Sequence, residues 1–116
     1  MNNNNKDPLA YLRLMLDSFR KVVDFTGGMS YENFLKDEKT QSATIMQMEI
    51  IGQLVKKVSP EIKKEIDIAW KEMSGMRDII AHEYFDLDLP IVWDTATKDV
   101  PEAQEKIKKY FLKIEN

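Results

Sequence analysis

The chain has 116 residues, of which 43% are hydrophobic and 32% charged, a size and composition typical of one folded domain. The absence of cysteine excludes disulfide scaffolds, thiolate zinc sites, iron–sulfur clusters and cysteine nucleophiles. A formal charge of -3 is far from the basic excess of a dedicated nucleic-acid-binding protein. Without a leader pattern or an apolar run of about 18 residues, we expect a cytoplasmic protein with no membrane segment.

The N-terminal segment is polar and the helical pattern starts soon after it. Residues 1–6 contain a run of asparagines that can bury nothing, so we expect a disordered tail there and a single domain over residues 7–116. Asp7 and the proline after it provide an N-cap and a first helical position. The first long helix is expected to end before Gly27, and its apolar positions recur at three- and four-residue steps: Leu9, Leu12, Leu16, Phe19 and Val23.

Two caps predict the next two helices. Ser30 can begin a short helix and Asp37 a longer one. The apolar stripe of the longer helix is expected to be Ala43, Met46, Ile50, Leu54 and Val58. Gly52 lies inside this helix, where it costs about 1 kcal/mol relative to alanine. Close approach of two helices would account for that glycine.

The C-terminal half is also predicted to be helical. The periodic stripe behind Pro60 favours a helix over 60–84, in one piece or two. Asp88 then repeats the cap-and-proline pattern, and Val100 opens an amphipathic last helix. No segment alternates like a strand. The fold class is therefore all-α, an antiparallel bundle of four main helices with one or two short ones.

Chemistry is concentrated in one short stretch. The chain has a single histidine, His82, and neither a metal-binding histidine pair nor a phosphate-binding glycine loop, so we expect no metal and no cofactor. Asp78 precedes His82 by four residues, a helical spacing at which a carboxylate can orient an imidazole for acid–base work. Arg77 adds a planar cation that suits phosphate. Arg77 and Tyr84 are two helical turns apart and would share a face.

The same residues also have a purely structural interpretation. An arginine and a histidine near a helix end can form a surface ion-pair group or interact with the helix dipole. Tyr84 can be a half-buried aromatic residue, in which case its replacement by phenylalanine would be a mild change.

Arg77, His82 and Tyr84 together resemble the R-x4-H-x-Y motif of the HepT-like branch of the HEPN (higher eukaryotes and prokaryotes nucleotide-binding) superfamily. The resemblance covers essentially all of residues 7–115. The chain departs from the family pattern at Gln53 and Leu54, where an acid and an alanine are common. Further matching positions follow in the family's order: Phe34, Asp37, Thr40, Gln41, Ala43, Glu49, Ile50, Ile51, Gly52, Trp70, Gly75, Met76, Asp78, Glu83, Val92 and Trp93.

The resemblance implies a HEPN-like homodimer that acts as a metal-independent ribonuclease on RNA. It implies Arg77 and His82 as catalytic residues, Asp78 as a supporting polar residue and Tyr84 as the acceptor of AMP. The partner would be an MNT-type nucleotidyltransferase antitoxin, which neutralises the toxin by AMPylation in a type VII-like (HepT/MntA) toxin–antitoxin system.

Two other hypotheses stay open. The chain could be a non-catalytic helical binding module that docks a nucleotidyltransferase and serves as AMP acceptor, which the net charge of -3 favours because an acidic surface lowers non-specific RNA affinity. It could also be a helical dimer whose site has decayed. The intact Arg77, His82 and Tyr84 argue against decay.

Overall fold

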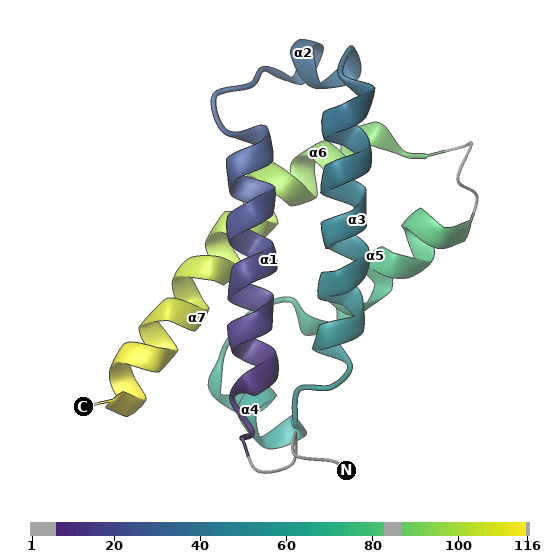
Figure 1. Ribbon diagram of the computed structural model, residues 1–116. Helices are drawn as coiled ribbons and strands as arrows, with labels where there is room; N and C mark the ends of the chain where they lie inside the picture. The colour runs from purple at the N-terminus through teal and green to yellow at the C-terminus, as the bar shows by residue number, and fades with distance from the viewer. Residues whose placement is uncertain (1–6, 83–86, 116) are drawn as a thin grey trace.

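The computed structural model describes residues 7–82 and 87–115, and those residues form only helices and their connections (Figure 1). Four helices are long and three short, where one or two short ones were predicted. The long helices are α1 (Ala10–Thr26), α3 (Glu38–Val55), α5 (Trp70–His82) and α7 (Val100–Glu115). The short helices are α2 (Tyr31–Leu35), α4 (Pro60–Glu65) and α6 (Leu89–Asp94), and a π-helical segment, η2 (Thr95–Asp99), joins α6 to α7.

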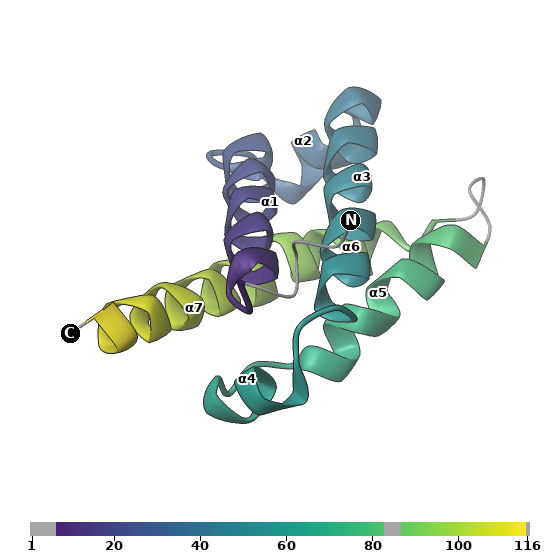
Figure 2. The same ribbon diagram turned by 60° about the horizontal axis from the view of Figure 1, so that its bottom comes forward.

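The centre of the molecule is the antiparallel pair α1 and α3 (Figures 1 and 2). The other two long helices flank this pair, α7 against α1 and α5 against α3. The predicted all-α bundle is thus confirmed, although α5 and α7 splay away from the central pair at their C-terminal ends (Figure 2). The largest fully buried apolar side chains come from α1, α2, α3 and α7: Leu12, Met15, Phe19, Val22, Phe34, Met48, Ile51, Val55, Val100 and Ile107.

Side-chain caps explain where most helices begin. Ser30, Asp37, Ser59 and Asp88 each accept a hydrogen bond from the backbone N–H three residues further on, which satisfies a donor that the first helical turn leaves free. The predicted starts at Ser30, Asp37 and Asp88 are therefore confirmed. Asp7 does not directly precede its helix. Its carboxylate accepts a hydrogen bond from the Leu9 N–H at 3.0 Å, and α1 begins at Ala10.

The predicted helix over 60–84 forms two pieces within the described residues. The backbone turns to an extended conformation at Ile66, and α5 starts at Trp70. The Trp70 indole N–H donates to the carbonyl oxygens of Lys63 at 3.1 Å and Ile66 at 2.9 Å. Because these carbonyls belong to the end of α4, one side chain stabilises the break and sets the start of α5.

The last long helix, α7, begins at Val100 as predicted, but it continues directly from α6 and the π-helical segment. The chain is helical without a break from Leu89 to Glu115, with a five-residue π-helical segment immediately before Val100. The Val100 N–H bonds to the carbonyl oxygen of Thr95, five residues back. Pro101 has no N–H to continue the α-helical ladder, which accounts for a local irregularity at this place.

The predicted apolar stripe of α3 is wrong in part. Val58, just beyond the helix, is buried and Leu54 packs against the core, but Met46 and Ile50 are exposed. The side chains that face the core are Thr44, Ile45, Met48, Ile51 and Val55, whereas Met46 is 59% exposed and Ile50 36% exposed. Both sets recur with helical spacing, and periodicity alone does not say which one meets α1 and α5. Gly52 is buried in the single chain, so the chain itself covers this glycine.

Two predictions fall outside the described residues. The disordered tail was assigned to residues 1–6, and the end of the predicted 60–84 helix reaches into 83–86. Among the described residues, no helix combines the length and hydropathy needed to cross a bilayer.

We expect Phe34→Ala to lower the free energy of unfolding by about 3–5 kcal/mol. Phe34 is fully buried, and its ring centroid lies 5.1 Å from that of Trp93, so truncation leaves a cavity where α2 meets α6. Urea unfolding monitored by circular dichroism measures the loss. Leu35→Ala is the matched control because Leu35 is 43% exposed; equal losses for the two variants would contradict this account of the core.

Candidate functional site

The predicted site residues fall at the C-terminal end of α5. The backbone of Arg77, Asp78 and His82 is helical there, and the side chain of Asp78 is exposed. For Arg77 and for residues 79–82 the structure describes the backbone alone. Tyr84 lies in 83–86, outside the described residues, so the predicted AMP acceptor stays a prediction.

The helix fixes the relative register of the three described positions. At about 100° per residue, Asp78 and His82 are about 40° apart around the axis, and Arg77 and His82 about 140°. Met73 and Met76 are buried and mark the face of α5 that packs on the core. By helical register, the backbone positions of Asp78 and His82 lie on the side of α5 roughly opposite to these methionines, and the Asp78 side chain is exposed.

The end of α5 is also remote from the centre of the fold. The helix packs against α3 and runs outward from it, so that its C-terminal turn projects from the side of the bundle (Figures 1 and 2). A helix end in this position is reachable by a large substrate or by another protein chain.

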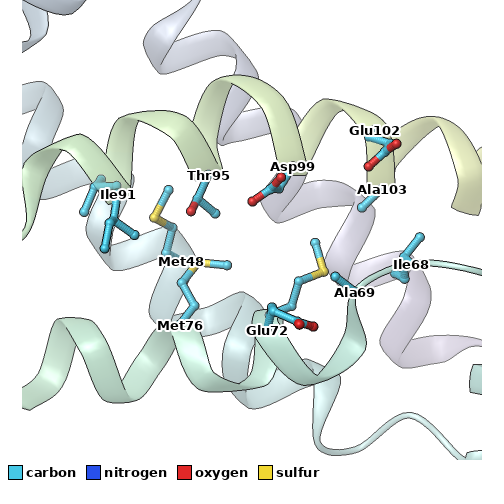
Figure 3. Close-up of a pocket in the computed structure, with 12 residues that line it drawn as sticks. Met48, Ile68, Ala69, Glu72, Met76, Ile91, Thr95, Asp99, Glu102 and Ala103 are labelled. Carbon is cyan, nitrogen blue, oxygen red and sulfur yellow. The ribbon is translucent and has the colours of Figure 1, made fainter.

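A cavity lies between α5 and the continuous helix formed by α6, η2 and α7 (Figure 3). It has a volume of about 260 Å³, and buried side chains of α3, α5, α6 and α7 form its apolar wall. Three exposed carboxylates, Glu72 from α5 and Asp99 and Glu102 from the opposite helix, line the same cavity. The apolar lining consists of Met48, Ile68, Ala69, Met73, Met76, Ile91, Val92 and Ala103, with the hydroxyl of Thr95 among them.

The carboxylates of the cavity repel one another. Desolvation raises the pKa of Asp99 above its ordinary value, and the negative charges of Glu102, Asp94 and Glu72 raise it further. Lys98 acts in the opposite direction but is paired with Asp94 at 3.5 Å. In the part of the chain that the structure describes, no three His, Cys, Asp or Glu side chains are close enough together to hold a metal ion.

Sequence reasoning missed this cavity. Glu72 and Asp99 are far apart in the chain, and only the packing of α5 beside η2 brings them to one place. The one local signal was the pair Asp99 and Glu102, two acids three residues apart, a spacing that places them side by side on a helix.

The described residues form an all-α fold, and Arg77 and the chain's single histidine lie toward the end of one helix. The family model described as "Ribonuclease HepT-like" matches residues 15–110. The chain belongs to this family, as its motif predicted.

Curated relatives agree with this family. "Putative RNase MJ0127" of Methanocaldococcus jannaschii is 37% identical over 111 residues, which cover 95% of this chain and 92% of the relative. "Putative RNase TTE0752" of Caldanaerobacter subterraneus is 36% identical, covering 93% of this chain and 97% of the relative. "Probable ribonuclease HepT" of Thermococcus cleftensis is 36% identical, with 94% and 97% covered. No solved structure matches the chain significantly.

Proposed function

We propose that this protein is a metal-independent endoribonuclease and the toxin of a type VII-like toxin–antitoxin system. The observation that carries the proposal is the match of residues 15–110 to the HepT-like ribonuclease family, a span that includes the whole R-x4-H-x-Y motif from Arg77 to Tyr84. The names of the relatives as RNases support the same activity.

Arg77 and His82 are the proposed catalytic residues, and the chemistry needs two imidazoles. One His82 removes the proton of a ribose 2′-OH, whose oxygen attacks the adjacent phosphorus, while a second His82 protonates the 5′ oxygen as its bond to phosphorus breaks. Arg77 binds the phosphate and offsets the charge of the transition state. Asp78, one helical turn before His82, holds an imidazole N–H and so fixes the ring's orientation.

Because each chain has one histidine, this mechanism requires a homodimer. We propose that the outward face of α3 takes part in the dimer seam. That face carries apolar residues on the side of α3 opposite to the buried Met48: Ala43, Met46 and Ile50. A helix that is apolar on two opposite faces is typical of one packed between two layers, and the single chain covers only one face of α3.

We expect the double substitution Met46→Glu with Ile50→Glu to convert a dimer into a monomer at micromolar concentration. Charges placed on both exposed positions would oppose burial of this face of α3. Sedimentation velocity measures the mass, and Leu14→Glu is the control, because Leu14 is 52% exposed on α1 and lies outside this face. A wild-type chain that sediments as a monomer would contradict the dimer. It would also contradict the mechanism in which one His82 is the general base and a second is the general acid.

We expect the cleavage products to end in a 2′,3′-cyclic phosphate or its hydrolysed form, with cleavage undiminished in excess EDTA. The cyclic ester follows from attack by the neighbouring 2′ oxygen, which also makes a DNA strand of the same sequence resistant. Mass spectrometry of the fragments of a short RNA reads the ends directly. Fragments with a 3′-hydroxyl, or cleavage that EDTA abolishes, would overturn the mechanism.

Regulation would use the same site. AMP transferred to Tyr84 by an MNT-type nucleotidyltransferase adds a phosphodiester charge and a purine about two helical turns from Arg77 along the chain. The modification would compete with RNA for the same cation. Tyr84 is therefore the proposed acceptor and the nucleotidyltransferase the proposed partner.

The second candidate function is a non-catalytic module that docks the nucleotidyltransferase and receives AMP. The formal charge of -3 favours it, because an acidic surface weakens non-specific binding to RNA. The two functions differ in one outcome: the module accepts AMP but cuts no RNA at any practical concentration.

A further inference from the structure

The cavity between α5 and the α6, η2 and α7 helix is not used by the proposed ribonuclease chemistry. Its described lining comes from Met48 and from 68–76 and 91–103, and the proposed chemistry assigns no role to these residues. The kind of ligand that fits this cavity is inferred from its shape and charge, independently of the proposed function.

The wall of the cavity is apolar and preformed. Met48, Met73, Met76 and Val92 are buried side chains that already pack against the core, so an apolar group entering the space displaces water without disturbing the fold. Methionine side chains adapt their shape to irregular ligands. An apolar cavity of roughly 150 Å³ is enough to bind benzene in another protein. A volume of about 260 Å³ therefore takes a body of six or more carbons together with a polar head.

The charge of the lining side chains determines which polar group a ligand of this cavity would carry. Glu72 reaches toward the space from α5, and Asp99 and Glu102 reach it from the opposite helix (Figure 3). None of the described lining residues is basic. Desolvation raises the pKa of Asp99, and the nearby carboxylates of Glu102, Asp94 and Glu72 raise it further. A positive charge placed among these carboxylates would therefore be stabilised in a way that a neutral group would not.

The arrangement suits an amine better than a metal ion. The described residues contain no group of three carboxylate or imidazole side chains close enough to coordinate one ion. An ammonium group has three N–H donors and can bond carboxylates that are spread around a cavity mouth, while its carbon chain lies against the methionines.

We propose that this cavity is a binding site for a small organic cation, a primary amine carried on a short apolar body. The apolar wall provides most of the affinity and the three carboxylates provide the preference for positive charge. Glu72 lies on α5 and Asp99 on η2, so a bound amine would tie α5 to the C-terminal helix across the cavity.

Hexylamine, with hexanol as the neutral probe of the same length, tests the proposal on the full chain. Methyl-¹³C methionine labelling gives a direct readout, because Met48, Met73 and Met76 line the cavity whereas Met15 and Met46 do not. We expect hexylamine to shift the first three methyl signals in a saturable way and to leave the last two unchanged. Hexanol should bind at least about threefold more weakly, the size of a partly exposed charge interaction.

Three substitutions separate the effect of charge from the effect of available space. Asp99→Asn should weaken hexylamine binding about threefold to fivefold with little effect on hexanol, whereas Glu105→Gln, which removes an exposed acid outside the cavity, should leave both unchanged. Ala103→Leu fills the cavity and should abolish binding of both probes. If the Ala103→Leu variant fails to fold, the comparison of Asp99→Asn with Glu105→Gln still tests the preference for a cation.

Three results would overturn the proposal. The first is no saturable shift at Met48, Met73 or Met76. The second is equal binding of hexylamine and hexanol, or equal effects of Asp99→Asn and Glu105→Gln, which would remove the preference for a cation. The third is methyl shifts that follow protein concentration in place of amine concentration, which would assign the cavity to a second copy of the chain.

Discussion

His82→Ala should abolish RNA cleavage, with a loss of at least about 10²-fold to 10⁴-fold in rate, and should relieve growth inhibition in cells that express the chain without its partner. The reason is that this histidine is the only imidazole of the chain and serves as both general base and general acid in the proposed dimer. A time course of cleavage of a defined RNA, under single-turnover conditions, measures the rate.

The folded state provides the control for this result. Because His82 occupies the last position of α5, its replacement by alanine should leave the helix content and the sedimentation coefficient of the wild type. Lys71→Ala, at an exposed position in the first turn of the same helix, should retain full cleavage. Undiminished cleavage by a correctly folded His82→Ala variant would refute the catalytic assignment and leave the binding module as the better hypothesis.

Tyr84→Phe should eliminate the transfer of AMP and release the toxin from control by its nucleotidyltransferase. Phenylalanine keeps the ring and removes the hydroxyl that would form the phosphodiester, so the whole gain of adenylate mass should be lost. Intact-mass spectrometry after incubation with the partner enzyme and ATP measures the transfer. In cells, the variant should inhibit growth even when the partner is present.

The chain offers matched controls for the acceptor. Three other tyrosines, Tyr11, Tyr31 and Tyr110, carry the same hydroxyl elsewhere in the fold. Tyr110 is half-buried on α7, and its replacement by phenylalanine should leave the adenylate gain unchanged. A modified Tyr84→Phe variant would show that the acceptor is a different residue. If the wild-type chain cleaves RNA but never gains AMP, the ribonuclease activity would be supported and its regulation by AMP transfer would be refuted.

The local features of this fold were readable from the chain because they depend on neighbours in sequence. Ser30, Asp37 and Asp88 cap helices through hydrogen bonds that span three residues, and Gly27 ends α1 where the pattern predicted. The family motif was readable for the same reason, since Arg77, Asp78, His82 and Tyr84 lie within one short segment. Such local features can be predicted without knowing which helices pack against one another.

The packing of α3 and the acidic cavity depend on segments that are distant in sequence. The stripe with Met46 and Ile50 and the stripe with Met48 and Val55 have equivalent periodicity, and only the positions of α1 and α5 decide which one is buried. Likewise, Glu72 and Asp99 become neighbours only when α5 packs beside η2. Side-chain periodicity defines the faces of a helix, whereas the free energy of burial chooses among them, and that choice is made by the whole chain at once.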